Sequence, residues 1–249
     1  SEPEAVSEPV PTGPCAARGK LDLEVRRDGL YRGSQTAPPI ADVRMIDKCQ
    51  GTTEPTRVGG TQRVRFRPTD GAEFSFLITP VAPTVGYYPS VTEVWLFPYP
   101  DVRGDLPVSL VPKDEVRDPA VVGSPITDVF KGVYDPNKAH FVLEIVEDRC
   151  PLGGFRPTVV GHPETIIQYA GAGYAVDPEL KATAPAGNAF VFISGVTPGP
   201  GTVEFAGTSG ACKLAPPRLF VPVNTGKYPL VAGTATFVSL VSTPIVAAP

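Results

Sequence analysis

Proline is the residue that most restricts what this chain can form, because 31 of its 249 residues are proline and they occur along its whole length. An average globular protein contains only ~5% proline. Proline breaks the interior of a helix, and in sheets it is confined to edges and turns. We therefore exclude a helical bundle and expect short strands that are separated by many turns.

Alternating apolar and polar residues predict many of these strands. Leu21, Leu23 and Val25 alternate with charged residues, which is the pattern of a strand with one buried face. The other predicted strands are residues 43–46, 63–67, 74–78, 91–99, 108–111, 140–146, 158–160, 165–169, 189–194, 202–205, 219–223 and 234–241. Short strands at a spacing of roughly 8–12 residues are typical of sandwiches and barrels. We therefore predict an all-β chain of two immunoglobulin-like or transthyretin-like β-sandwich domains with little helix.

The composition also predicts where the chain divides. Residues 1–14 repeat Ser-Glu-Pro, which favours an extended, proline-rich tail without a core. Residues 15–135 are predicted to form the first sandwich and residues 136–249 the second. Asp70-Gly71 is a turn signal between two predicted strands of the first sandwich, 63–67 and 74–78, and it predicts a hairpin there.

The cysteines indicate the cellular compartment of the protein. There are four of them, Cys15, Cys49, Cys150 and Cys212, and no two form a Cys-x-x-Cys pair. Three pairings are possible, and we favour Cys15–Cys49 with Cys150–Cys212 because it places one bridge in each half of the chain. The alternative is four reduced thiols in a cytosolic protein. Disulfides persist in oxidising compartments, so we expect an extracytoplasmic protein. Since the chain begins with Ser1 and its single methionine is Met45, we also expect that a leader has been removed.

The main concentration of aromatic side chains is at residues 87–99 and comprises Tyr87, Tyr88, Trp95, Phe97 and Tyr99. In a strand, Trp95, Phe97 and Tyr99 would share one face, and apolar residues occupy the other face as well. Such a strand is central in a sheet or is covered by another element. We favour a core role, and the alternatives are a protein interface and a platform on which sugars stack.

Three arginines, Arg63, Arg65 and Arg67, would form a basic ridge on one face of a predicted strand. A solvated edge strand that resists aggregation is the simplest interpretation. The functional alternative is a surface for an acidic protein partner or an anionic polysaccharide.

Residues with the spacing of a catalytic or metal site are missing from the sequence. Its two histidines, His140 and His162, have no neighbours with the spacing of a zinc site, and Gly-x-Ser-x-Gly does not occur. We predict no catalytic residues, no metal and no cofactor. The net charge of −4 argues against nucleic acid as a partner. No apolar stretch approaches the ~20 residues of a membrane span, so we expect membrane association only through a partner or an unseen anchor.

Residues 158–243 resemble the carboxypeptidase-regulatory-like family of transthyretin-like β-sandwiches. The resemblance rests on the run Ala189-Phe-Val-Phe-Ile-Ser-Gly-Val-Thr-Pro-Gly199 with the following Thr202-Val-Glu-Phe205, and on Val231-Ala-Gly-Thr-Ala-Thr-Phe-Val-Ser-Leu240. The early turn of the family is matched loosely by Gly171-Ala172-Gly173. The family has no catalytic residues, so the resemblance implies a structural or binding module of an exported protein. Residues 15–135 resemble no family known to us.

These observations together predict a non-catalytic, exported structural or binding subunit of an extracytoplasmic assembly. The alternatives are a carbohydrate-binding adhesin and a secreted hydrolase. Glu2, Glu4 and Glu8 in the tail lack a nearby cation, and the tail has few apolar residues with which to order itself. We therefore expect the tail to contact a protein partner in the assembly.

Overall fold

The computed structural model describes residues 20–27, 40–59, 64–69, 71–82, 86–96, 103–113, 130, 132–171, 176–185, 189–218 and 223–245. Every regular element within these residues is a strand, so the prediction of an all-β fold is confirmed. Below, the first half means the described residues up to 113 and the second half those from 130 onward. The tail of residues 1–14 lies outside the described residues.

The strands of the first half are β1 (Lys20–Arg27), β2 (Ile40–Asp47), β3 (Gly51–Thr52), β4 (Thr56–Gly59), β5 (Val64–Phe66), β6 (Glu73–Pro80), β7 (Ser90–Val91), β8 (Trp95–Leu96) and β9 (Arg103–Leu110). Those of the second half are β10 (Ala139–Glu147), β11 (Thr158–Val159), β12 (Ile166–Tyr169), β13 (Ala189–Val196), β14 (Thr202–Ala206), β15 (Thr208–Ser209), β16 (Cys212–Ala215), β17 (Val223–Asn224), β18 (Lys227–Pro229) and β19 (Ala235–Pro244). The described part of the predicted strand 91–99 is divided between β7 and β8.

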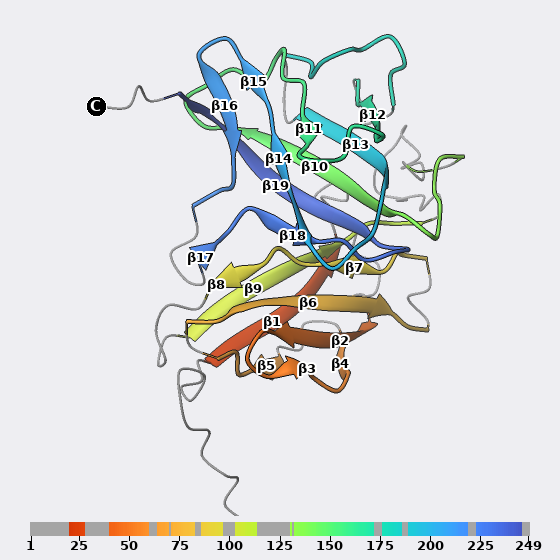
Figure 1. Ribbon diagram of the computed structural model, residues 1–249, viewed down its shortest axis with the longest axis vertical. Coiled ribbons are helices and arrows are strands. Elements are labelled where there is room, and N and C mark those ends of the chain that lie inside the picture. The colour runs from red at the N-terminus through yellow and green to blue at the C-terminus, as the bar shows by residue number, and fades with distance from the viewer. Residues whose placement is uncertain are drawn as a thin grey trace, which may run out of the picture.

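A nine-stranded sheet runs through both halves of the molecule (Figure 1). Its strands follow the order β12-β13-β10-β19-β9-β1-β5, and β16 with β15 extends it beside β19. The two halves of this sheet meet where Thr236 of β19 pairs with Leu110 of β9. In each half the first strand pairs in parallel with the last one, β1 with β9 and β10 with β19.

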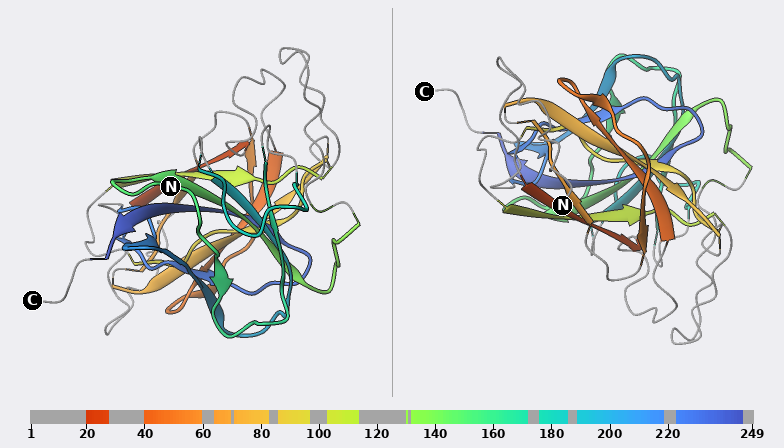
Figure 2. Two further views of the ribbon diagram at one scale, coloured as in Figure 1. Left: turned by 90° about the horizontal axis from the view of Figure 1, so that it is seen from above. Right: turned by 90° about the horizontal axis from the view of Figure 1, so that it is seen from below.

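Each half of the large sheet is covered by a smaller sheet. In the first half, β2, β6 and their neighbours form a seven-stranded sheet whose Phe76 lies 4.8 Å from Phe66 of β5, measured between ring centroids. In the second half, β11, β14 and β18 form a three-stranded sheet whose Phe205 lies 5.0 Å from Phe141 of β10. Figure 2 shows that β2 and β6 cross over β1 and β9 instead of continuing them. Two sandwiches therefore share one long sheet.

Each sandwich has its own hydrophobic core, and a third core lies where the halves meet. The first core contains only residues of the first half, and the second contains only residues of the second half. The third core joins Tyr88 and Val111 of the first half to Phe130, Val142 and other residues of the second half. Strand β10 contributes to the second and third cores from its two faces, which explains why its residues 139–145 are all buried.

The predicted hairpin around Asp70-Gly71 is wrong. Strand β5 pairs with β1 in the nine-stranded sheet, whereas β6 pairs with β2 in the seven-stranded sheet. The chain therefore turns a corner between two packed layers here. The apolar side chains of β5 and β6 meet across the core of the sandwich, as the Phe66–Phe76 ring contact shows. A turn signal fixes a reversal of direction, but it does not fix which sheet the next strand joins.

Buried Asp47 holds this corner in place. Its Oδ2 atom accepts a hydrogen bond of 2.6 Å from the Thr69 amide, and its Oδ1 atom accepts one of 2.8 Å from the Cys49 amide. The Gln50 side chain adds a 2.7 Å bond to the Thr69 hydroxyl. One carboxylate thus satisfies backbone donors of two separate turns, which is what a buried charged group requires.

The second half contains the predicted disulfide Cys150–Cys212. It joins the segment after β10 to the start of β16, across a sequence separation of 62 residues. Cys49 is also disulfide-bonded, and its predicted partner Cys15 lies outside the described residues. The alternative of four reduced thiols is therefore wrong.

Candidate functional site

The candidate site lies where an edge strand of the first half turns toward the second half. Val91 pairs with Leu77 of β6 and Trp95 pairs with Phe74, so three residues of the edge strand lie opposite two residues of β6. This extra residue is a β-bulge, and a bulge redirects the backbone and side chains of its strand. The redirected residues are Glu93 and Val94.

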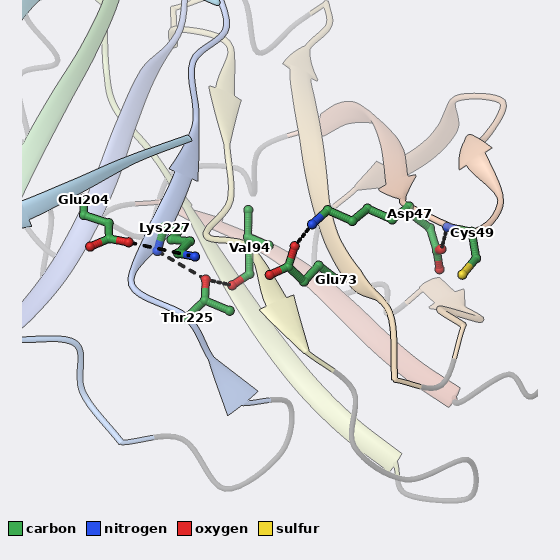
Figure 3. A network of polar contacts seen from close by, with 8 residues as sticks. Asp47, Cys49, Glu73, Val94, Glu204, Thr225 and Lys227 are labelled. Atoms are coloured by element: carbon green, nitrogen blue, oxygen red, sulfur yellow. Dashed lines mark hydrogen bonds and ion pairs between the residues drawn. The ribbon is translucent and has the colours of Figure 1, made fainter. Parts of the chain in front are cut away.

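Val94 uses its free backbone groups to bond the second half. Its amide donates to the Lys227 carbonyl oxygen at 2.7 Å, and its own carbonyl oxygen accepts from the Thr225 amide at 3.2 Å and the Thr225 hydroxyl at 2.5 Å. Next to these bonds, β17 pairs with β8 through Val223–Leu96 and Asn224–Trp95. Figure 3 shows Thr225 reaching Val94 across the boundary, with the Lys227 amide bonded to the Thr225 hydroxyl. We call this contact, residues 92–96 against residues 223–228, the seam.

Glu93 is buried in the seam. Its carboxylate accepts a hydrogen bond from the Gly226 amide, and it also bonds the Tyr228 side chain. Burial raises the pKa of Glu93 to about 7, although both hydrogen bonds act in the opposite direction. Burial likewise raises the pKa of Tyr228, and the nearby Glu93 charge raises it further.

Position 226 of the seam requires glycine, because of its backbone conformation and because a neighbouring side chain lies close to it. Its φ is +73°, a conformation that residues with a Cβ rarely adopt. A Cβ at this position would also lie 2.7 Å from Cγ of Pro216. The absence of a side chain therefore allows the amide to approach the Glu93 carboxylate.

A groove of about 390 Å³ opens beside the seam. Its first-half residues are Ile46, Lys48, Glu73, Phe74, Ser75 and Val94, and its second-half residues are Pro200, Gly201, Thr202, Lys227 and Pro229. Ile46 pairs with Ser75 across β2 and β6, and both point to the sheet face opposite the core residues Met45 and Phe76. The groove is thus formed jointly by the outer face of one sandwich and a loop and edge strand of the other.

The charges of the groove are largely paired. Lys48 forms an ion pair with Glu73, and Lys227 Nζ lies 4.0 Å from Oε1 of Glu204 (Figure 3). The remaining polar side chains are the hydroxyls of Ser75 and Thr202, and neither histidine nor cysteine is among the lining residues. Proline and aliphatic side chains provide the apolar part. Such a mixture of apolar surface with a few polar groups is suited to binding an uncharged or mixed-charge ligand.

The described aromatic residues of the predicted cluster are inside the molecule. Trp95 is 6% exposed and packs against Phe74 and Phe76, while Tyr87 and Tyr88 are also buried. This placement favours the core interpretation of these residues, since a buried ring is not available to stack on a sugar. The other two members of the cluster, Phe97 and Tyr99, lie outside the described residues.

The described arginines of the predicted ridge are exposed, Arg65 on the edge strand β5 and Arg67 just after it. Arg65 forms a two-point ion pair with Asp22 of β1, through contacts of 2.7 and 3.1 Å. Arg67 is exposed after the end of the strand, and Arg63 lies outside the described residues. Because Arg65 is already paired with its neighbour, the described ridge carries less positive charge for a partner than the sequence indicates.

The two histidines have separate surroundings. His162 is in a surface turn, where its Nδ1 atom lies 3.2 Å from Oε1 of Glu164. His140 is buried at the start of β10, stacked at 4.8 Å on the Tyr134 ring and 2.9 Å from the Asp135 carbonyl oxygen. Within the described ranges, no group of three or more His, Cys, Asp or Glu side chains is placed to hold a metal ion.

Lowering the pH should destabilise the protein through His140. Burial lowers the pKa of His140, although the Asp135 carbonyl and carboxylate act in the opposite direction. Its contribution to stability is therefore complete above the ordinary pKa of 6.5 and is lost as the pH falls through the lowered value. In urea titrations at a series of pH values, His140→Phe should lose the part of the pH dependence that this histidine causes. His162→Gln should retain it, and the same curve for all three proteins would contradict the prediction.

The sequence did not point to Glu93, Gly226 and Tyr228 as a site. Glu93 is one acidic residue within an aromatic strand, and its neighbours in the seam follow more than 130 residues later. The Asn-Thr-Gly-Lys turn at residues 224–227 is a turn signal, but its partner is set by tertiary packing.

Comparisons with known proteins do not assign the chain to a family. No family model matches it, and no curated protein sequence matches it. Among solved structures, it is similar to a mutant form of the major pilin of Streptococcus pyogenes with 8% identity and a TM-score of 0.24, covering 91% of this chain and 98% of that chain. It is also similar to a C-terminal fragment of the pilus adhesin SpaC from Lactobacillus rhamnosus GG, with 10% identity, a TM-score of 0.20, and coverage of 93% and 99%. TM-scores this low do not establish a shared topology, and the resemblance of residues 158–243 to transthyretin-like sandwiches stays a prediction.

Proposed function

We propose that this chain is a non-catalytic structural and binding subunit of an extracytoplasmic protein assembly. The oxidised cysteines support the extracytoplasmic location, because disulfides such as Cys150–Cys212 persist in secreted, periplasmic and surface proteins. The described residues contain no helix with the length and apolarity needed to cross a membrane.

Two sandwiches that share one sheet support a structural role. The parallel pairs β1–β9 and β10–β19 and the separate core of each half favour two domains, which we place on either side of residue 135. The third core and the seam then hold these domains in one orientation. A subunit that transmits force or maintains spacing in an assembly needs such a fixed arrangement.

The groove supports a binding role. It exists only when both halves are in place, and its lining combines apolar side chains with charged groups that are paired. We assign it to contact with a protein partner and assign the proline-rich tail, residues 1–14, to a second contact. Extended proline-rich segments bind with a small loss of conformational entropy, since the φ angle of proline is already fixed.

A blocking substitution in the groove tests this function. Thr202→Trp places a large side chain at an exposed lining position, and Thr158→Trp provides a matched control on the same three-stranded sheet outside the groove. Native complexes from cell-surface extracts of the source organism should become smaller with Thr202→Trp and with deletion of residues 1–14. Those with Thr158→Trp should keep their size, as measured by native sizing and mass spectrometry.

Three results would contradict the proposal. Unchanged complexes with Thr202→Trp would exclude the groove as a contact, and unchanged complexes after the deletion would exclude the tail. A full-length protein that is cytoplasmic, or monomeric at every concentration without any partner in native extracts, would overturn the assignment as a whole.

A further inference from the structure

The seam contains a buried carboxyl group that bonds the first half to the second. Glu93 is 8% exposed and lies at the bulge between β7 and β8, where a neutral residue would fill the same space. Burying an ionised carboxylate is costly unless it is fully compensated. Here the compensation consists of two donors, the Gly226 amide and the Tyr228 hydroxyl, both of which belong to the other half.

The charged side chains around Glu93 are directed elsewhere. Lys227 lies between the two donors in sequence, but its Nζ atom lies 4.0 Å from Glu204 on the outer face of the three-stranded sheet. Opposite the bulge, β6 presents Ser75 and Phe76, which carry no charge. Tyr228, from β18, is therefore the titratable group that faces Glu93 among the described residues, and no cation there neutralises the carboxylate.

We propose that Glu93 forms a pH-sensitive contact between the two halves, which stabilises the seam more when its carboxyl group is protonated. A protonated carboxyl group remains an acceptor for the Gly226 amide, and it avoids the cost of burying a charge. The ionised group draws water toward the bulge and weakens the Val94 backbone bonds beside it. The inference concerns how the halves are coupled and does not depend on what the groove binds.

The sign of the pH effect follows from the direction of the shift. Because the pKa of Glu93 is raised from 4.5 to about 7, its contribution is complete below pH 4.5 and is lost as the pH rises through 7. Over the whole range, a pKa raised from 4.5 to about 7 corresponds to a change of up to ~300-fold in the unfolding equilibrium constant. This direction is opposite to that of His140, so the two groups are separable by substitution.

The first measurement is the titration of Glu93 itself in the wild-type protein, by NMR of the side-chain carboxyl carbon. A midpoint near 7 is expected, and a midpoint near 4.5 would overturn the inference. Unfolding constants of wild type and Glu93→Gln should then diverge from about pH 5 to about pH 8, by roughly 70-fold. Glu204→Gln, which removes an exposed carboxylate of the neighbouring strand β14, should follow the wild type. A constant ratio between wild type and Glu93→Gln would overturn the inference.

Amide hydrogen exchange tests whether the effect is located at the seam. The Val94 and Thr225 amides bond across the seam, whereas the Ala235 amide bonds Pro89 across the boundary at another point. After correction for the intrinsic rate, raising the pH from about 5 to about 8 should increase exchange at Val94 and Thr225 more than at Ala235. An equal increase at all three amides would show a global change of stability and would overturn the local role of Glu93. This measurement needs only the wild-type protein, so it stands even if Glu93→Gln does not fold.

Discussion

Replacing Cys150 and Cys212 together by alanine is expected to lower the free energy of unfolding by roughly 4 kcal/mol, the value that the chain-entropy model gives for a loop of this length. The bridge closes a separation of 62 residues and joins the segment after β10 to β16, and these two strands lie on opposite sides of β19. The loop between the two cysteines contains β12, β13 and β14. Without the bridge, this whole region gains freedom in the unfolded chain.

Urea denaturation with near-ultraviolet circular dichroism measures this loss. Reduction of the wild type cleaves the Cys49 disulfide as well, so the double variant is the cleaner comparison. Ser242→Ala is a useful control, because it removes a 2.6 Å hydrogen bond to the Cys150 carbonyl oxygen and leaves the disulfide intact. A buried neutral hydrogen bond contributes about 1 kcal/mol. A loss in the double variant no greater than in Ser242→Ala would contradict the prediction.

Replacing Trp95 by alanine is expected to cost about 3–5 kcal/mol, the usual loss for truncating a buried large aromatic residue. The ring lies 5.9 Å from Phe74 and 6.3 Å from Phe76 between centroids, inside the core of the first sandwich. Its backbone also pairs with Asn224, so the cavity would lie directly behind the seam.

Trp95→Phe separates the loss of packing from the loss of the indole. The Trp95 Nε1 atom is buried without a hydrogen-bond partner among the described residues, so phenylalanine removes a donor that gains nothing in the folded state. We therefore expect the phenylalanine variant to lose much less stability than the alanine variant in thermal and urea unfolding. An unchanged unfolding midpoint for Trp95→Ala would mean that the ring is exposed in solution. That result would favour the interface and sugar-binding alternatives.

Short-range patterns predicted much of this architecture. The pattern of Leu21–Val25 predicted β1, whose described side chains Leu21 and Leu23 are buried, and residues 202–205 predicted β14, which has one buried and one exposed face. The apolar run at residues 140–146 predicted β10, whose two faces are covered by different cores. The preferred cysteine pairing in the second half, Cys150–Cys212, is also confirmed. Closing a shorter loop costs less entropy, which favours bridges between cysteines in the same half of the chain.

The sequence by itself therefore determined the fold class and most strand positions, because each depends on residue type and local spacing. Tertiary structure alone decided which sheet each strand joins, as the corner between β5 and β6 shows. It also decided that β17 pairs with β8, and that Glu93 meets Gly226 and Tyr228. These contacts join residues far apart in the chain, and they form where the two sandwiches pack together and the bulge at Glu93–Val94 leaves backbone groups to be satisfied. No local pattern carries that information, because the energy of such a contact depends on the surface that the other half presents.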